Sequence, residues 1–173
     1  MELVILKDQT KKIETMTIRR MEVEPPYEIY TYHTCFGIDG GTRNMGVAKI
    51  YPNNRDYVTI YEVSLERKPK PIDRMLDVQR ILAETIVWFG YDPKAVIEGA
   101  AYMNSIYRQA ELAEVRAAMA LWLHTFGVQV EFAPPNTIRK KVFGKGKEKN
   151  PWSNIPGNAA AALGCAYYAT KMV

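Results

Sequence analysis

Residues 35–50 read CFGIDGGTRNMGVAKI, and this stretch sets the pattern for the rest of the chain. An apolar run ends at one carboxylate, Asp39; two glycines and a polar turn follow, and apolar alternation resumes at Met45. This pattern predicts a buried strand, a tight turn and a returning strand. An aspartate beside glycines is often only part of a turn, so a functional role for Asp39 requires a second carboxylate at the same place.

A second carboxylate follows another short apolar run, in AVIEGAA at residues 95–101. This run predicts a buried strand with Glu98 at its carboxyl end. Ligands of open α/β sheets bind outside the carboxyl ends of adjacent strands. Asp39 and Glu98 therefore form a candidate divalent-metal site, and oxygen ligands favour Mg²⁺ or Mn²⁺ over zinc.

Length and composition are those of one globular domain: 173 residues, of which 47% are hydrophobic and 24% are charged. No apolar run approaches the roughly 18 residues of a membrane-spanning helix, and the charged N-terminus is not typical of a secretory signal. Cys35 and Cys165 lack the spacing of a zinc site, so we expect them in the core of an intracellular protein.

The net charge of +4 is concentrated near the C-terminus. One acid, Glu148, follows Phe132, against seven basic residues: Arg139, Lys140, Lys141, Lys145, Lys147, Lys149 and Lys171. Such a local excess favours binding of a polyanion, with a solvated basic face as the alternative.

Apolar periodicity and turn residues predict the order of the elements along the chain. Residues 1–34 are expected to form an N-terminal β extension, a hairpin with its turn at 7–12, and residues 35–173 the main domain. The elements expected in the main domain are strands 35–39, 45–51 and 57–65, helix 72–89, strand 95–98, helix 104–126, strand 128–133, a basic helix 136–143 and a final helix 158–171.

This order predicts an α/β fold with a five-stranded mixed sheet, flanked by helices. Three strands are antiparallel and two are parallel. Right-handed crossovers would place strand 95–98 parallel to strand 35–39 and beside it. Asp39 and Glu98 would then meet at one edge of the sheet.

Three motifs resemble the RuvC family of Holliday junction resolvases, which has the ribonuclease H-like fold. They are GIDGGTRNMGVA from Gly37, VIEGA from Val96, and a tail that reads PNTIRKKVFGKGKEKN and then NAAAALGCAYYA. They occur in order and at family-like spacing over residues 35–173. The resemblance implies a homodimeric, Mg²⁺-dependent endonuclease (Mn²⁺ can substitute) that nicks two opposed strands of a four-way DNA junction. It would use two metal ions about 4 Å apart.

The resemblance implies four catalytic positions, with metal ligands at Asp39, Glu98 and the start of the final helix. The two family acids of that helix correspond here to Asn158 and Ala161, one turn apart on one face. Asn158 offers one neutral oxygen as a metal ligand and Ala161 offers none. We therefore expect weak or absent cutting with retained junction binding; whether the change is engineered or natural stays open.

Further residues are expected to contact DNA or a second copy of the chain. Tyr102 follows the glutamate near the place of a family aromatic, although a buried or dimer-facing role is equally consistent. Helix 104–126 is where the family dimerises, and Ala117, Ala118 and Ala120 would permit close approach. The DNA-binding candidates besides Tyr102 are Arg43, Arg139, Lys140, Lys141, Lys145, Lys147 and Lys149.

Three alternatives remain open. A ribonuclease H-fold relative of the YqgF branch would act on RNA. A sugar-kinase or actin-like domain shares the Asp-Gly-Gly-Thr pattern but is about twice as long and duplicates it. A catalytically silent DNA-binding module would keep the fold without the acids. For a resolvase we expect a cytoplasmic, nucleoid-associated location, or the host cytoplasm if the chain is phage-encoded.

Overall fold

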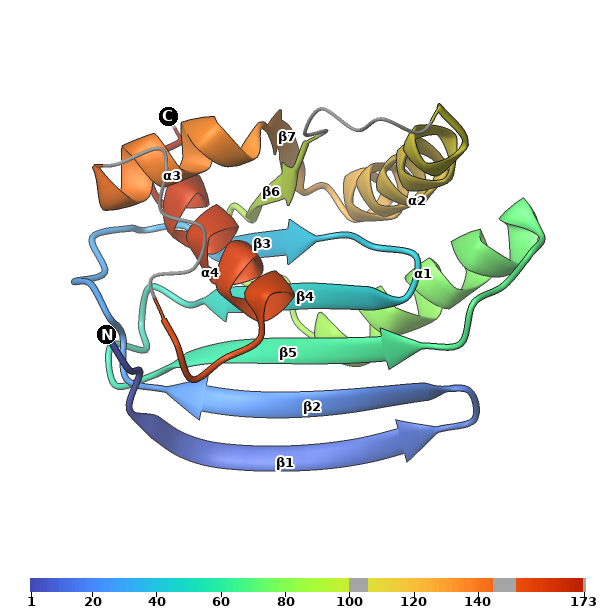
Figure 1. Ribbon diagram of the computed structural model, residues 1–173. Coiled ribbons are helices and arrows are strands. Elements are labelled where there is room, and N and C mark those ends of the chain that lie inside the picture. Colours follow the sequence, from blue (N-terminus) through green and yellow to red (C-terminus); the bar gives the residue numbers. More distant parts are fainter. Residues whose placement is uncertain (100–105, 145–151, 173) are drawn as a thin grey trace.

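The computed structural model describes residues 1–99, 106–144 and 152–172 (Figure 1). These residues form one sheet of seven strands in the order β1-β2-β5-β4-β3-β6-β7. The strands are β1 (Ile5–Ile13), β2 (Met16–Val23), β3 (Cys35–Asp39), β4 (Asn44–Ile50), β5 (Val58–Leu65), β6 (Lys94–Glu98) and β7 (Gln129–Ala133). The helices are α1 (Pro71–Thr85), α2 (Ile106–Thr125), α3 (Pro135–Phe143) and α4 (Gly157–Ala169).

The predicted α/β architecture is confirmed. Strands β5, β4 and β3 are antiparallel, and β6 and β7 continue the sheet in parallel with β3. The sheet has seven strands and not the predicted five, because β2 pairs with β5 along its whole length, from Met16 opposite Leu65 to Val23 opposite Val58. The hairpin therefore extends the central sheet at the free edge of β5.

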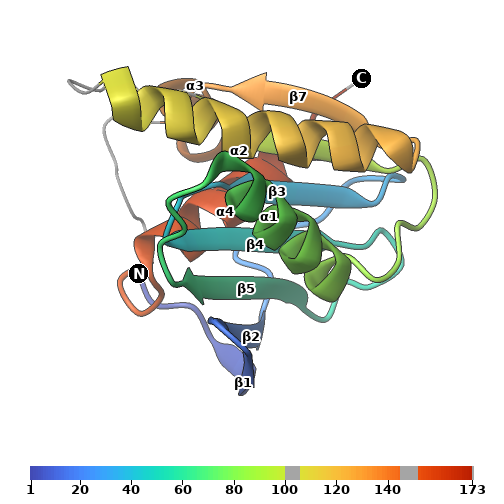
Figure 2. The ribbon, with the colours of Figure 1, turned by 90° about the vertical axis from the view of Figure 1, so that its right-hand side faces the viewer.

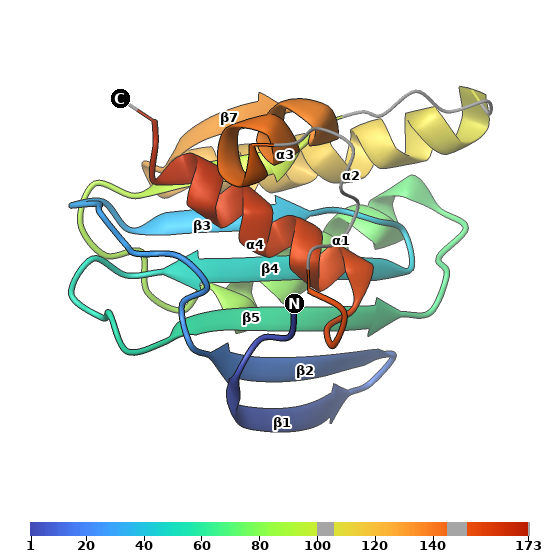
Figure 3. The same cartoon turned by 60° about the vertical axis from the view of Figure 1, so that its left-hand side comes forward.

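Helices cover both faces of the sheet. Helices α1 and α2 lie on one face (Figure 2), and α4, with α3 beside it, lies on the other (Figure 3). Alternation along β3 supplies both apolar cores: Phe36 and Ile38 face α1 and α2, whereas Cys35 packs with α4. No helix in the described parts of the chain is long and apolar enough to cross a bilayer.

Two glycines let α4 lie directly against the sheet. A Cβ at Gly37 of β3 would stand 2.0 Å from the backbone oxygen of Ala162, and a Cβ at Gly46 of β4 would stand 2.1 Å from that of Asn158. Neither spacing is compatible with a side chain, so the backbones of strand and helix touch only because both residues are glycine. This contact fixes the height of α4 above the carboxyl end of β3.

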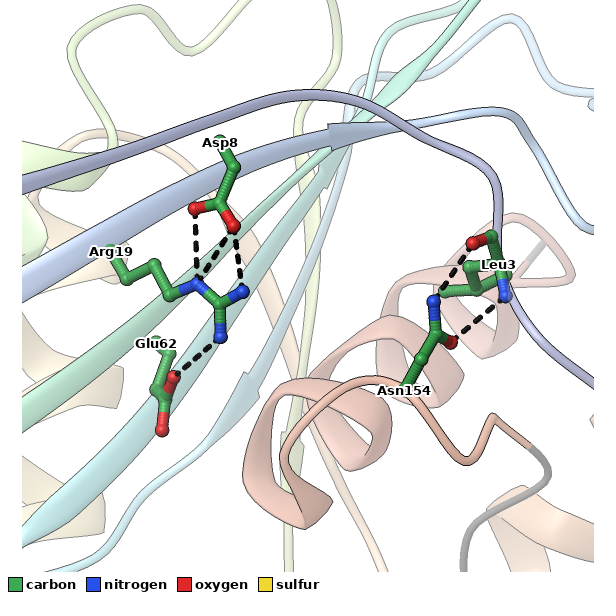
Figure 4. Close-up of polar contacts among 5 residues, drawn as sticks. All are labelled: Leu3, Asp8, Arg19, Glu62 and Asn154. Carbon is green, nitrogen blue, oxygen red and sulfur yellow. Dashed lines mark hydrogen bonds and ion pairs between the residues drawn. The ribbon is translucent and has the colours of Figure 1, made fainter.

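Polar contacts tie the hairpin to the rest of the molecule (Figure 4). The Arg19 guanidinium donates to Asp8 of β1 and lies 3.8 Å from Glu62 of β5, so it spans three strands. The Leu3 amide donates to Asn154 Oδ1, and Asn154 Nδ2 donates to the Leu3 carbonyl, both at 2.9 Å. The N-terminal segment is thereby fastened to the loop that leads into α4.

Two predicted boundaries were wrong. The hairpin turns at Glu14 and Thr15 and not within 7–12, because these polar residues belong to an exposed edge strand that does not require apolar side chains. Helix α1 ends at Thr85 and not at Phe89. The Phe89 ring instead stacks on Phe126, 4.9 Å between centroids, so its apolar character reflects an aromatic cluster outside the helix.

Candidate active site

Asp39 and Glu98 end two neighbouring strands. The parallel pairing of β3 and β6 places Ile38 opposite Ile97, so the next residues, Asp39 and Glu98, lie side by side where the strands end. Asp39 follows Gly37 by two residues and therefore faces the side of the sheet that α4 covers. The two acids thus share one half-buried position at the edge of α4.

Burial makes both acids hard to ionise, and the charge of Asp39 adds to this effect at Glu98. Burial raises the pKa of Asp39 to about 6, while the charges of Arg116 and Arg139 act in the opposite direction. Burial raises the pKa of Glu98 to about 7, and the neighbouring Asp39 charge raises it further. Perturbed carboxylates of this kind are typical of sites that bind a cation or handle protons.

The two positions of the final helix lie beside this pair. Gly46, against which the Asn158 backbone packs, is the Cα partner of Asp39 in the ladder of β3 and β4. Ala161 follows one turn later, next to the Ala162 that contacts Gly37. Asn158 Nδ2 is buried and has no hydrogen-bond partner among the described residues. An orphaned amide of this kind can turn its oxygen toward a ligand.

Arg116 of α2 belongs to the same place, although we did not predict it from the sequence. Its charge acts on the pKa of both Asp39 and Glu98, and its Nε is buried without a hydrogen-bond partner in the described parts of the chain. A signal was present: Arg116 is four residues after Leu112 and three before Met119, so it interrupts the apolar stripe of its helix.

These residues do not fit a centre of two divalent ions. Two carboxylates and one neutral amide face two arginines, so the site has little net negative charge to offset two ions. No group of three or more His, Cys, Asp or Glu is arranged to hold a metal ion in residues 1–99, 106–144 and 152–172. One Mg²⁺, which often binds through one or two carboxylates and keeps several waters, is the most that this set accommodates.

The predicted DNA-binding residues divide into four groups. Arg139 of α3 is half-buried and near enough to act on the pKa of both acids. Lys140 and Lys141 are exposed on the same helix, and Lys141 Nζ lies 4.3 Å from the ring centre of Tyr168. Arg43 is exposed in the turn between β3 and β4. The remaining candidates lie outside the described residues: Tyr102, Lys145, Lys147 and Lys149.

Comparisons with known proteins identify the fold. No family model and no curated protein matches the sequence. Among solved structures, T. thermophilus RuvC in complex with a Holliday junction substrate superposes with a TM-score of 0.63 at 14% identity, covering 78% of this chain and 90% of that chain. A Thermus thermophilus RuvC structure superposes with a TM-score of 0.60 at 16% identity, covering 77% and 90%. The chain therefore has a RuvC-like, ribonuclease H-like fold.

Proposed function

We propose that this chain is a structure-selective DNA-binding protein of the junction-resolving endonuclease type, which binds four-way junctions and cuts them weakly. The observation that carries the proposal is the register of β3 and β6, which brings Asp39 and Glu98 together beside α4. One solved structure of the same fold holds a Holliday junction substrate, and this supports branched DNA as the ligand.

The composition of the site accounts for weak cutting. Mg²⁺, or Mn²⁺ in its place, would supply the Lewis acid for phosphodiester hydrolysis, with Asp39, Glu98 and the Asn158 amide as its ligands. Ala161 adds no ligand. Arg116 and Arg139 carry permanent positive charge to the same place and would contact the phosphate oxygens. The chain would thus orient the scissile phosphate well but activate it poorly.

The basic surface and a second copy of the chain would complete the DNA complex. Lys140 and Lys141 on α3, together with Lys145, Lys147 and Lys149, would contact the phosphate backbone. Symmetric cuts require a homodimer, for which α2 is the candidate interface, with Ala117 exposed. The expected location is the nucleoid, or the host cytoplasm for a phage protein.

Fluorescence anisotropy with labelled nucleic acids tests the binding proposal directly. The protein should bind a four-way DNA junction at least about tenfold more tightly than a DNA duplex of equal length at the same salt concentration. An RNA of equal length should compete poorly. Equal affinity for junction and duplex would contradict the proposal, and preference for RNA would favour the RNA-directed alternative.

A catalytically silent junction-binding protein is the second candidate. It is favoured by the charge balance of two arginines against two carboxylates, which leaves little demand for a metal. Prolonged incubation of the junction with Mn²⁺ separates the two candidates. Slow cutting that a Glu98→Gln variant lacks supports the weak endonuclease, whereas no cutting above that variant supports the silent protein.

A further inference from the structure

Two grooves lie side by side along residues 25–30, in the segment that joins β2 to β3. One has a volume of about 400 Å³ and the other of about 230 Å³, and the same three residues, Tyr27, Glu28 and Tyr30, line both. These three residues therefore form a ridge between the grooves. The larger groove is completed by Pro25, Pro26, Ile29 and Arg55, and the smaller by Val142, Tyr167, Thr170 and Lys171.

The two grooves are separate from the acid pair. The chain between β2 and β3 passes the end of the sheet that lies away from the carboxyl end of β3 (Figure 3). On α4, Tyr167 follows Asn158 by nine residues, which is about 14 Å along the helix. A ligand in these grooves would leave Asp39 and Glu98 open to DNA, so the inference does not rest on the proposed function.

The ridge is held in place by the core beneath it. The Tyr27 amide donates to the Tyr167 hydroxyl, and this hydroxyl donates to the Tyr27 carbonyl at 3.0 Å. The Ile29 side chain is buried in the core that α4 covers, and Pro25 and Pro26 restrict the backbone before the ridge. The grooves are thus formed without a ligand, and binding to them requires little ordering of the protein.

Aromatic rings line both grooves. The Tyr30 side chain is 76% exposed on the ridge, and its hydroxyl donates to the Glu28 carboxylate. The Tyr27 ring is half-buried and packs edge-on against the Tyr167 ring, 5.3 Å between centroids. Aromatic-lined grooves of this kind are the surfaces on which proteins bind proline-rich segments. The exposed Tyr30 ring therefore indicates a protein ligand that offers prolyl rings.

The charges at the grooves indicate which proline-rich segment fits. Arg55 lines only the larger groove and Lys171 only the smaller, and both side chains are exposed. Against these two cations stands one carboxylate, Glu28, on the ridge. A nucleic acid strand that crossed both grooves would carry its phosphates past this carboxylate. A peptide with acidic residues only at its two ends would avoid it and meet the two cations.

The dimensions of the ridge suit a polyproline II helix. Such a helix turns once in three residues, about 9 Å, and its backbone carbonyls have no internal hydrogen bonds. Tyr27 and Tyr30 are three residues apart and span at most about 10 Å. Successive turns of the helix can therefore enter the two grooves, with the ridge between them.

We propose that the two grooves bind a proline-rich segment of a partner protein, with acidic residues at both ends of the segment. Its prolines lie against the rings of Tyr27 and Tyr30, and its terminal carboxylates pair with Arg55 and Lys171. The partner is thereby attached at the end of the molecule away from the acid pair.

The test is an NMR titration of the isotope-labelled 173-residue chain with a peptide of six prolines and two glutamates at each end. Amide signals of the ridge and of Thr170 and Lys171 should shift. Tyr30→Ala should weaken binding by about fivefold or more, as for an interface anchor, whereas Tyr30→Phe should retain it. Arg55→Gln with Lys171→Gln should weaken binding and remove the preference over a peptide with lysines at its ends.

Matched controls come from the same chain. Tyr32 is 87% exposed but lines neither groove, and Lys12 is exposed on β1, so Tyr32→Ala and Lys12→Gln should leave peptide binding unchanged. Circular dichroism of Tyr30→Ala should stay that of the parent. A peptide with alternating glycine and serine in place of the prolines should bind the parent at least about fivefold more weakly.

Three outcomes would overturn the proposal. The first is an absence of signal shifts at the ridge on addition of the proline peptide. The second is equal affinity of the parent and Tyr30→Ala for that peptide. The third is loss of junction affinity in Tyr30→Ala, which would assign the grooves to the DNA-binding surface. Peptide binding that depends on Tyr30, with junction affinity unchanged, would support a separate protein-binding site.

Discussion

Two clusters of arginines and acids lie against α2, and they differ in how far their charges are paired. In the first, Arg74 contacts Glu111 and Glu114 directly, with the shortest ion pair at 2.6 Å. In the second, Asp39 and Glu98 lie near Arg116 and Arg139, yet no ion pair or hydrogen bond joins these four side chains in the described structure.

The difference indicates which cluster is structural. The side chains of the Arg74 cluster make most of their hydrogen bonds within the protein, and removal of Arg74 would leave buried groups unpaired. The second cluster keeps the raised pKa values of Asp39 and Glu98, a cost that a folded chain retains where a ligand completes the site. A buried Nε without a partner does not separate the clusters, because Arg74 and Arg116 each have one in the described parts of the chain. Incomplete pairing therefore points to the site more specifically than charge alone.

The largest effect is expected from restoring acids to the second cluster. Asn158→Asp with Ala161→Asp should raise Mg²⁺-dependent cutting of a four-way junction by about 100-fold or more, because bound metal contributes several kcal/mol to hydrolysis. Gel electrophoresis of labelled junctions measures the rate. Adding Glu98→Gln should abolish the gain, and an absent gain would mean that these positions are not the missing ligands.

The next effect concerns the first cluster. Arg74→Met should lower the free energy of unfolding by about 3 kcal/mol, because it leaves the half-buried Glu114 without its cation and Glu111 with only the more exposed Arg67. Arg116→Met should change it by less than about 1 kcal/mol while weakening junction binding. Urea denaturation measures both variants. Equal destabilisation by the two substitutions would remove the distinction between the clusters.

Neutralising the three lysines at 145, 147 and 149 should weaken junction binding without changing stability, as is expected for Arg116→Met in the second cluster. Lys145→Gln, Lys147→Gln and Lys149→Gln together should reduce junction affinity about tenfold and lower the salt dependence by about three counterions. Stability in urea should stay that of the parent. Unchanged affinity at several salt concentrations would show that these lysines face away from DNA.

The smallest effect is a pH dependence of stability. Glu98 has an ordinary pKa of 4.5 and a pKa of about 7 in the folded chain. Between these values the folded state keeps a proton that the unfolded state has lost, so the free energy of unfolding falls as pH rises from about 4.5 to 7. In metal-free buffer, Glu98→Gln should stabilise the protein by about 1–2 kcal/mol near pH 8 and not near pH 4.5.

Glu24→Gln is the control for this experiment, because Glu24 is exposed at the far end of the sheet. It should leave the pH profile unchanged. A Glu98→Gln profile parallel to that of the parent would show that Glu98 titrates normally.

The adjacency of Asp39 and Glu98 could be predicted because chain order and crossover handedness restrict how two apolar strands pair. Arg116 was missed because a single charged residue in an apolar stripe does not reveal what it faces. Arg74 was missed because it pairs with residues 37 and 40 positions away, across two elements. Both depend on how α1 and α2 pack on one face of the sheet, which local periodicity does not specify.

The paired amide contacts of Leu3 and Asn154 have a consequence for how the protein is made. Leu3 leaves the ribosome 151 residues before Asn154, so the segment before β1 can form these hydrogen bonds only after the loop before α4 has been synthesised. The backbone contacts of Gly37 and Gly46 with α4 also cannot form until α4 has been synthesised. Folding should therefore finish only after α4 has left the ribosome, and a nascent chain stalled before residue 154 should be degraded by protease more readily than the 173-residue chain.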